Sequence, residues 1–239
     1  MSNSKKSLTL LTGATSGIGL ELAKRLVLTD DLVVVGRKTE SEAHVLISNK
    51  VQYIQADISS PKQAVEVISS ALQNMQIDKI DRVIHCAGTG VYTSPEQETV
   101  EQIDQNVSVN LLFPVLLTRA LVPQIEVAKG KVVLIGSVAH KGSSNMASYA
   151  ASKAGLAGFA RSLEAEWRGR IDVQVIHPGP TLTPMLEKAG YTVGMERHLF
   201  LSPQVMADAV IKTIHSRKKS ATIFLGAKIK SLLFRKKNA

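Results

Sequence analysis

The sequence carries a tyrosine and a lysine four residues apart, Tyr149 and Lys153. At this spacing the phenol and the ammonium lie on one face of a helix. A free tyrosine has a pKa of about 10, and a nearby lysine lowers that pKa because the cation favours the phenolate. Ser137 ends an apolar run just upstream, where its hydroxyl can hydrogen-bond a substrate oxygen. The three side chains predict proton exchange with a carbonyl or alcohol near neutral pH; for the Tyr and Lys spacing alone, an exposed lysine beside a packed tyrosine is the alternative.

A glycine-rich loop, TGATSGIG at residues 12–19, follows the first β-rich run and precedes the first helical segment. Gly13 permits a tight turn, Gly17 lets the backbone approach a pyrophosphate, and Gly19 lets helix and strand pack closely. The helix N-terminus offers free N–H groups and its positive dipole end to phosphates. This order predicts a dinucleotide site rather than a plain turn. The expected contacts are Gly13, Thr15, Ser16, Gly17, Ile18 and Gly19.

Two cations, Arg37 and Lys38, end the second β-rich run. An acid about 20 residues beyond the glycine loop usually meets the ribose 2′-hydroxyl of NAD. Here the corresponding position holds Arg37, while Asp30 and Asp31 precede the strand and stand at its wrong end. Two cations suit a 2′-phosphate, so we expect NADP(H) in preference to NAD(H). The alternative is that both are solvated loop charges.

Seven β-rich runs alternate with segments of helical spacing. Their apolarity is continuous rather than alternating, which predicts a parallel sheet covered on both faces. The alternation itself predicts a doubly wound, Rossmann-type α/β domain. The predicted strands are 8–12, 32–35, 51–55, 82–85, 131–135, 172–176 and 221–225. The predicted helical segments are 18–27, 64–72, 100–121, 148–167 and 204–214, in one domain spanning 1–225 and followed by a basic tail, 226–239.

Charge is unevenly distributed along the 239 residues, whose net charge is +9. Residues 212–239 hold nine basic side chains and no acid, so residues 1–211 are neutral. This argues against a generally basic nucleic-acid-binding body, and no nucleic acid partner is expected. The only cysteine, Cys86, excludes an intrachain disulfide and a Cys-rich zinc site, and we expect no metal. The longest apolar run, 111–122, contains Pro114 and Arg119, so no membrane span is expected.

Taken together, these motifs resemble the short-chain dehydrogenase/reductase family over roughly residues 7–225. The resemblance implies that Ser137 stabilises the substrate oxygen and that Tyr149 is the acid/base. It implies that Lys153 holds the nicotinamide ribose and lowers the tyrosine pKa, and that Asn110 supports a proton-relay water. The matching positions are the glycine loop, Asp57, Ala87, Gly88, Asn110, Ser137, Tyr149, Lys153, Pro178, Gly179 and Thr183.

The same resemblance implies further cofactor contacts. Asp57 corresponds to an adenine contact and Thr183 to a contact with the nicotinamide carboxamide. The implied set is Asp57, Ile58, Ala87, Gly88, Tyr149, Lys153, Pro178, Gly179, Thr181 and Thr183. One departure stands out, because the family usually has Asn-Asn-Ala-Gly where this chain has His85-Cys86-Ala87-Gly88. We interpret Cys86 as a small buried core residue and His177 as structural.

The remaining segments bear on substrate and partners. Residues 180–202 correspond to the family's mobile flap, and their apolar content suggests a hydrophobic substrate. Segments 100–121 and 148–167 are apolar on more than one face, and the resemblance implies a homodimer or homotetramer. The tail places Ile229, Leu232 and Leu233 on one side of a helical wheel, flanked by cations. That pattern fits a solvated terminus, contact with an anionic membrane, or an acidic partner such as an acyl carrier protein.

From these observations we expect an NADP(H)-dependent oxidoreductase, a ketone or aldehyde reductase for a small-molecule substrate. Two alternatives remain open, an NAD-linked alcohol dehydrogenase and a non-catalytic NADP-sensing regulator. The expected location is the cytoplasm, with peripheral attachment to a membrane surface as the alternative.

Overall fold

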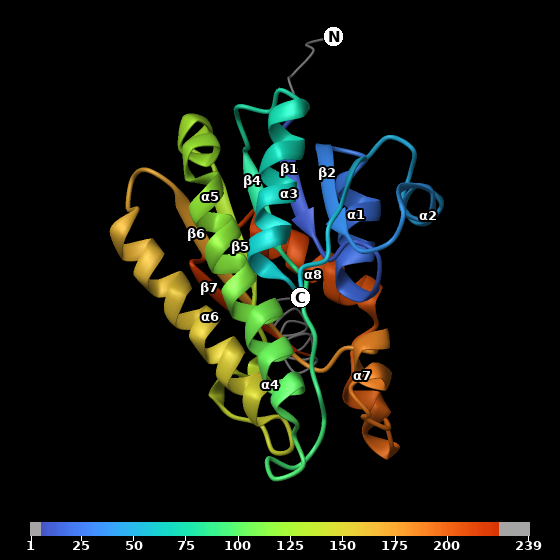
Figure 1. The fold of residues 1–239 in the computed structure, drawn as a ribbon. Helices are drawn as coiled ribbons and strands as arrows, with labels where there is room; N and C mark the ends of the chain where they lie inside the picture. The colour runs from blue at the N-terminus through green and yellow to red at the C-terminus, as the bar shows by residue number, and fades with distance from the viewer. Residues whose placement is uncertain (1–5, 225–239) are drawn as a thin grey trace, which may run out of the picture.

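A parallel seven-stranded sheet forms the centre of the molecule (Figure 1). The structure is a computed structural model that describes residues 6–224, so the predicted tail, 226–239, lies outside the described residues. The strand order is β3-β2-β1-β4-β5-β6-β7, and every neighbouring pair is parallel. The predicted doubly wound α/β class is confirmed. The strands are β1 (Leu8–Thr12), β2 (Asp31–Gly36), β3 (Gln52–Gln55), β4 (Arg82–His85), β5 (Lys131–Ile135), β6 (Asp172–Pro178) and β7 (Ser220–Ile223).

Helices cover both faces of this sheet (Figure 1). On one face lie α3 (Pro61–Asn74), α4 (Val100–Val107), α5 (Phe113–Ala128) and α6 (Ala147–Glu166). On the other lie α1 (Gly17–Leu26) and α8 (Pro203–Ile214). The shorter elements are α2 (Glu40–Leu46), α7 (Pro184–Lys188), a π turn at Ser108–Leu112 and 3-10 turns at Val138–Lys141 and Met195–Leu199.

Two apolar cores explain why the strands are continuously hydrophobic. Leu10 of β1 packs under α3 and α5, whereas its neighbour Leu11 packs under α1 and α8. Both side chains are fully buried. Burying one leucine contributes roughly 1.5–3 kcal/mol, so a strand buried on both faces is favoured wherever apolar residues are consecutive. This packing fixes the carboxyl ends of the strands at one edge of the sheet.

The segment 100–128 differs from the prediction. Helical turns run without interruption from Val100 to Ala128, because Pro114 occupies the beginning of α5, directly after the π turn. Among the residues described, this is the one helix long and apolar enough to cross a membrane by length and composition. The expectation that no segment reaches that size was therefore wrong. In the fold its residues Phe113, Leu117 and Ile125 are fully buried against the sheet.

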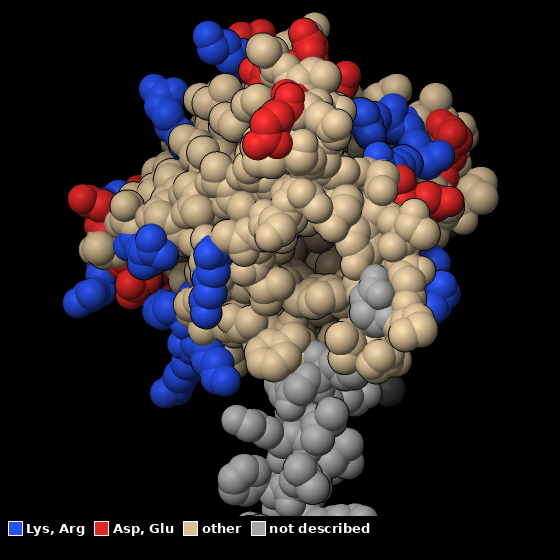
Figure 2. Space-filling model, turned by 90° about the horizontal axis from the view of Figure 1, so that it is seen from below, with Lys and Arg blue, Asp and Glu red and all other residues tan. Residues whose placement is uncertain are grey.

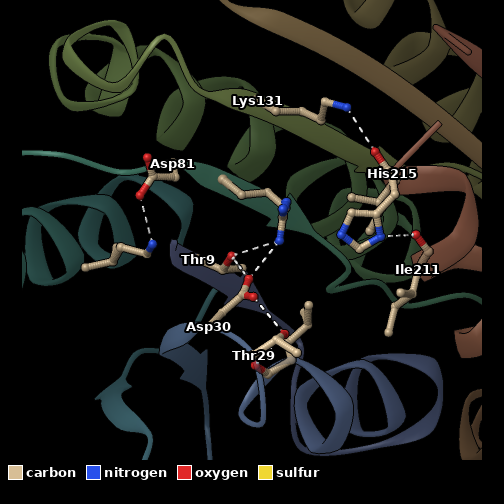
Figure 3. A network of polar contacts seen from close by, with 11 residues as sticks. Thr9, Thr29, Asp30, Asp81, Lys131, Ile211 and His215 are labelled. Atoms are coloured by element: carbon tan, nitrogen blue, oxygen red, sulfur yellow. Dashed lines mark hydrogen bonds and ion pairs between the residues drawn. The ribbon is translucent and has the colours of Figure 1, made fainter. Parts of the chain in front are cut away.

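A polar network lies at the opposite, amino-terminal edge of the sheet (Figure 3). The buried carboxylate of Asp30 accepts a hydrogen bond from the Thr9 hydroxyl at 2.6 Å and one from the Arg82 guanidinium at 2.7 Å. Asp30 is therefore engaged far from the carboxyl edge, as its position before β2 predicts. The residues that follow the end of β2 are instead Arg37 and Lys38.

Candidate active site

The glycine loop packs tightly against the segment that follows β4. Gly13 has a φ of +74°, and a Cβ atom there would lie 2.6 Å from Cα of Ala87. A Cβ atom on Gly19 would lie 2.1 Å from the carbonyl oxygen of Gly13. No side chain fits at either position. The absence of side chains at Gly13 and Gly19 therefore lets the loop backbone lie close to its neighbours.

The N-terminus of α1 has the free donors that a dinucleotide phosphate requires. The N-cap residue, Ser16, makes no side-chain cap hydrogen bond, and the first turn contains no acid. The first N–H groups of a helix have no partner within the helix, so they remain available to an anion. Gly17 has a φ of +52°, and a Cβ atom there would lie 3.2 Å from Thr183. The loop, the helix N-terminus and the segment after β6 therefore fit a nicotinamide dinucleotide.

The predicted Tyr and Lys pair begins α6 and is buried. Tyr149 is 6% exposed and Lys153 4%. The Tyr149 side chain is hydrogen-bonded to that of Ser137, which follows β5. The Lys153 ammonium donates to the carbonyl of Ile135 at 3.0 Å and lies 5.8 Å from the centre of the Tyr149 ring. The end of β5 and the first turns of α6 thus bring all three side chains together.

Burial controls the protonation of this cluster. It raises the pKa of Tyr149 above its ordinary value, and the Ser137 hydrogen bond opposes this rise only in part. Burial also lowers the pKa of Lys153 to about 8. Lys153 is not among the groups that lower the pKa of Tyr149 in the protein alone, so the expectation that Lys153 and a positively charged nicotinamide together lower this pKa stays a prediction. Near neutral pH the hydroxyl is protonated and can donate a proton.

Asn110 anchors the loop that follows β4. Its Oδ1 accepts the Thr89 N–H at 3.0 Å, and its Nδ2 donates to the Thr89 carbonyl at 2.9 Å and to Ser152 at 3.2 Å. Asn110 lies in the π turn, and Pro114 has no N–H to donate to a carbonyl four residues earlier. The Asn110 carbonyl consequently lacks the donor that a regular α-helix would supply, and it can accept from a water.

Gly88 lies where the cofactor loop and the catalytic cluster meet. A Cβ atom on Gly88 would lie 3.1 Å from Oδ1 of Asn110 and 3.6 Å from Nζ of Lys153. The preceding Ala87 is held by its N–H, which donates to the Thr12 hydroxyl of β1 at 3.3 Å. The chain therefore passes between the glycine loop and the buried lysine with no side chain in the way.

A second pair of polar contacts lies one helical turn from the catalytic cluster. The Asn106 amide donates to the Ser148 hydroxyl at 2.7 Å, and Ser148 donates to the carboxylate of Glu98. Asn106 and Ser148 precede Asn110 and Ser152 by four residues each, so the two Asn–Ser contacts form successive rungs between α4 and α6. The first rung was not predicted. Asparagines at i and i+4 opposite serines at i and i+4 were the available signal.

Comparison with known proteins decides the family. Residues 7–193 match the short chain dehydrogenase family. This chain is a short-chain dehydrogenase/reductase.

Three proteins similar to this short-chain dehydrogenase/reductase illustrate the match. The short-chain reductase protein NovJ of Streptomyces niveus is 26% identical over 95% of this chain and 89% of its own. An acetoacetyl-CoA reductase from an Acinetobacter strain is 31% identical over 77% of each chain. A short-chain dehydrogenase from Sphingobium yanoikuyae, solved in complex with NADPH, has a TM-score of 0.81 at 25% identity, covering 97% of this chain and 94% of its own. The protein is therefore an NAD(P)-dependent oxidoreductase acting on CH–OH or C=O groups.

The departure from the family sequence after β4 is accommodated in the core. His85 is 2% exposed, and its Nε2 is hydrogen-bonded to the Thr118 hydroxyl at 2.8 Å. Burial lowers the pKa of His85 to about 3, which keeps the ring neutral. Cys86 packs beside the glycine loop, its Sγ 3.4 Å from where a Cβ of Gly19 would stand, and burial raises its thiol pKa to about 12. Cys86 is half-buried and packs against the core, rather than lying fully within it as we interpreted from the sequence.

His177 packs against the loop that carries Ser137. Its ring stacks on that of His140, with centroids 3.9 Å apart, and His140 is in turn hydrogen-bonded to the Ser137 carbonyl at 2.6 Å. His177 is 3% exposed, and burial lowers its pKa to about 4. The stack packs against the loop that carries Ser137. The interpretation of His177 as structural stays a prediction.

The other predicted cofactor contacts line the same edge of the sheet. Arg37 is exposed, whereas the ammonium of the neighbouring Lys38 lies 3.2 Å from the carboxylate of Glu42 in α2. Thr15 lies beside the end of β2, where its Cγ2 would be 3.1 Å from a Cβ on Gly36. The rest follow β3, β6 and the glycine loop: Ile18 is the second residue of α1, Asp57 and Ile58 follow β3, Pro178 ends β6, Gly179 and Thr181 follow it, and Thr183 precedes α7.

Aromatic side chains border the mouth of the site. The Tyr92 N–H donates to the Ala189 carbonyl at 2.7 Å, which joins the β4 loop to the segment 180–202. The rings of Tyr92 and Tyr191 meet edge to face at 4.8 Å, and Phe200 lies 6.1 Å beyond Tyr191. Figure 2 views this edge end on and shows a hollow near its centre, surrounded by uncharged residues. The sequence suggested an apolar flap, but only the fold pairs it with Tyr92.

Proposed function

We propose that this protein is an NADP(H)-dependent reductase of ketones or aldehydes. The observation that carries the proposal is the buried cluster of Ser137, Tyr149 and Lys153 beside Gly88 and the glycine loop. Its hydroxyl groups lie at the carboxyl edge of a parallel sheet, where ligands bind in open α/β folds. The raised pKa keeps the Tyr149 hydroxyl protonated near neutral pH, so a proton is present for the transfer that a carbonyl reduction requires.

In this proposal each residue has a separate task. The Ser137 hydroxyl donates a hydrogen bond to the substrate carbonyl oxygen, and the Tyr149 hydroxyl transfers its proton to that oxygen. Lys153 contacts the nicotinamide ribose, and its positive charge stabilises the phenolate left on Tyr149. Asn110 supports a water, and this water returns a proton toward the cluster. The bound nicotinamide supplies the hydride to the carbonyl carbon.

The preference for NADP(H) rests on the end of β2. Arg37 is exposed there, and a guanidinium binds a phosphate through parallel hydrogen bonds. Lys38 adds positive charge but is shared with Glu42. Similar structures were solved with NADPH and with NADH, so the preference rests on Arg37 and Lys38. The remaining contacts fit either dinucleotide.

An uncharged substrate fits the mouth of the site. Gly90 lies beside Tyr149, and a Cβ there would be 3.3 Å from the tyrosine ring and 3.7 Å from Met146. Together with Tyr92 and Tyr191, these residues give a largely apolar surface to the approach. We infer a ketone with an apolar body. An acyl thioester, of the kind named for the acetoacetyl-CoA reductase relative, belongs in the same test.

A screen of NADPH oxidation over ketones graded by chain length, thioesters included, tests the proposal. Turnover that rises with apolar length is expected. A wild-type protein that binds NADPH yet oxidises it with none of these carbonyls would favour the sensing regulator. Faster NAD⁺ reduction with the matching alcohols would favour the NAD-linked dehydrogenase.

We further propose a homodimer or homotetramer formed through α4 and α6. Val100, Ile103, Val107 and Leu112 are exposed along the helix 100–128, at 76%, 40%, 37% and 39%. Such a row of apolar side chains is typical of a protein–protein interface. Light scattering of the wild type and of Ile103→Glu tests this: the wild type is expected to be oligomeric and the variant to dissociate. A monomeric wild type would contradict it.

A further inference from the structure

The turn that carries Arg37 and Lys38 is held by side chains of the neighbouring strand. Both residues follow β2 and are exposed. The Tyr53 hydroxyl of β3 donates to the Lys38 carbonyl at 2.8 Å, and the Gln55 amide of the same strand donates to the Arg37 carbonyl at 3.3 Å. Both contacts are to the backbone, so neither of them uses the guanidinium or the ammonium.

Tyr53 reaches this turn from the apolar core. It is 8% exposed, and its ring packs in the same cluster as Ala43 of α2. Gly36 leaves room for the hydroxyl, because a Cβ atom there would lie 2.8 Å from the Tyr53 oxygen and 3.1 Å from Cγ2 of Thr15. Burial, followed by the charge of Glu42, raises the pKa of Tyr53 to about 12, so the hydroxyl keeps the proton that it donates. A phenylalanine would fill the same space, so the hydroxyl contributes its bond to the turn.

The turn is also fixed at both of its ends. Before it, the Gly13 N–H donates to the Val35 carbonyl at 3.1 Å, which joins the glycine loop to the end of β2. After it, the Thr39 N–H donates to the Glu42 carboxylate at 2.9 Å as part of the capping box. Ordering an exposed loop during binding costs affinity. A turn whose carbonyls are already bonded presents its cations to a phosphate with less of that cost.

We propose that Tyr53 is a positioning residue for cofactor selection and acts through its hydrogen bond to the Lys38 carbonyl. The bond fixes the direction in which Arg37 and Lys38 leave the sheet, and so strengthens the preference for a dinucleotide that carries a 2′-phosphate. Gln55 contributes in the same way but less, because its bond is longer and exposed. This inference rests on the proposed NADP(H) preference, which assigns the 2′-phosphate to Arg37.

Fluorescence titration with NADPH and with NADH tests the proposal, since these cofactors differ only in the 2′-phosphate. Tyr53→Phe removes the hydroxyl and keeps the ring in the core. Thr9→Val is the matched control, because it removes a buried hydroxyl that donates to Asp30 at 2.6 Å at the opposite edge of the same sheet (Figure 3). Arg37→Ala is measured beside them, alone and combined with Tyr53→Phe.

Tyr53→Phe should lower the ratio of NADPH affinity to NADH affinity about three- to tenfold, as expected for the loss of one hydrogen bond. Gln55→Ala should lower this ratio by less, and Thr9→Val should leave it unchanged. In the Arg37→Ala background, Tyr53→Phe should change the ratio less than it does in the wild type, because the main residue that it positions is gone.

The controls separate a failure of this inference from a failure of the proposed function. An unchanged ratio in Tyr53→Phe, an equal drop in Thr9→Val, or an undiminished effect of Tyr53→Phe in the Arg37→Ala background would each overturn the positioning role. The NADP(H) preference would stand in these cases if Arg37→Ala still weakened NADPH binding alone. If Arg37→Ala weakened both cofactors equally, the preference itself would fail, and the positioning role with it.

Discussion

Replacing Arg37 by Ala should separate the two nicotinamide cofactors. Arg37 is exposed at the end of β2, and its guanidinium makes no ion pair with any residue in the range 6–224. Lys38, in contrast, is 3.2 Å from Glu42. Glu42 is ionised at any physiological pH, because hydrogen bonds from Thr39, followed by Lys38, lower its pKa to about 2. A 2′-phosphate should therefore depend on Arg37 more than on Lys38.

The size of the effect follows from one charge-assisted contact. A hydrogen bond to a charged group contributes about 1.5–3 kcal/mol, and solvent at an exposed site favours the lower end. Since about 1.4 kcal/mol is a factor of ten in affinity, Arg37→Ala should weaken NADPH binding about 10- to 30-fold. NADH has no 2′-phosphate, so its affinity should change by less than about twofold.

Fluorescence titration with NADPH and with NADH measures both affinities without a substrate. Lys38→Ala should weaken NADPH binding less than Arg37→Ala does. Glu42→Gln should strengthen it, because Lys38 is released while glutamine can still complete the capping box with Thr39. Equal losses for NADPH and NADH in Arg37→Ala, or no loss for either, would refute the assignment of this residue to the 2′-phosphate.

Three further predictions concern the surroundings of the site. Burial lowers the pKa of His85 to about 3, so the unfolded chain binds an extra proton below about pH 6.5. For this reason the free energy of unfolding should fall by about 2 kcal/mol between pH 6.5 and pH 5. His85→Asn should flatten this pH dependence of the free energy of unfolding, measured in urea. An identical slope in the variant would contradict it. Ser148→Ala removes the hydroxyl that Glu98 and Asn106 share, and should lower the free energy of unfolding by about 1–3 kcal/mol. Turnover should be slower and NADPH affinity unchanged. An unchanged unfolding midpoint would argue against the contact between Asn106 and Ser148. The Cys86 thiol, with its pKa raised to about 12, should react with a disulfide reagent at pH 8 at least about tenfold more slowly than in the unfolded chain, and NADPH should slow it further; labelling at the unfolded rate would show that the thiol is not packed.

The central strands were predictable because they are buried on both faces, whereas the edge strand β7 contains no buried residue. Predicted and observed bounds coincide for β1, β4 and β5, where consecutive apolar residues leave no other placement. The missed helix α2 has seven residues, of which only Ala43 is buried, so it gives no amphipathic period. Its stability comes from the capping box of Thr39 and Glu42, a local signal that a search for apolar spacing does not detect.

The site was predictable in its composition but not in its contacts. Residues at the carboxyl ends of parallel strands meet at one edge, so the positions of Ser137 and Gly88 followed from strand order. The rung between Asn106 and Ser148 joins residues 42 apart in sequence, and the matching i, i+4 spacing of the asparagines and serines is its only trace in the sequence. The raised pKa of Tyr149 also depends on burial by the whole fold. The predicted helical segment 100–121 correctly runs through Pro114, but the π turn before this proline leaves no signature in composition.

The central claim is that Tyr149 is the proton donor in a carbonyl reduction, and Tyr149→Phe tests it most directly. The measurement is NADPH oxidation with the best ketone of the graded panel, beside NADPH binding by the same protein. The account predicts a loss of at least about 100-fold in kcat, because general acid catalysis contributes about that much, with NADPH affinity changed by less than about threefold. A Tyr149→Phe variant that still turns over at the wild-type rate would contradict it.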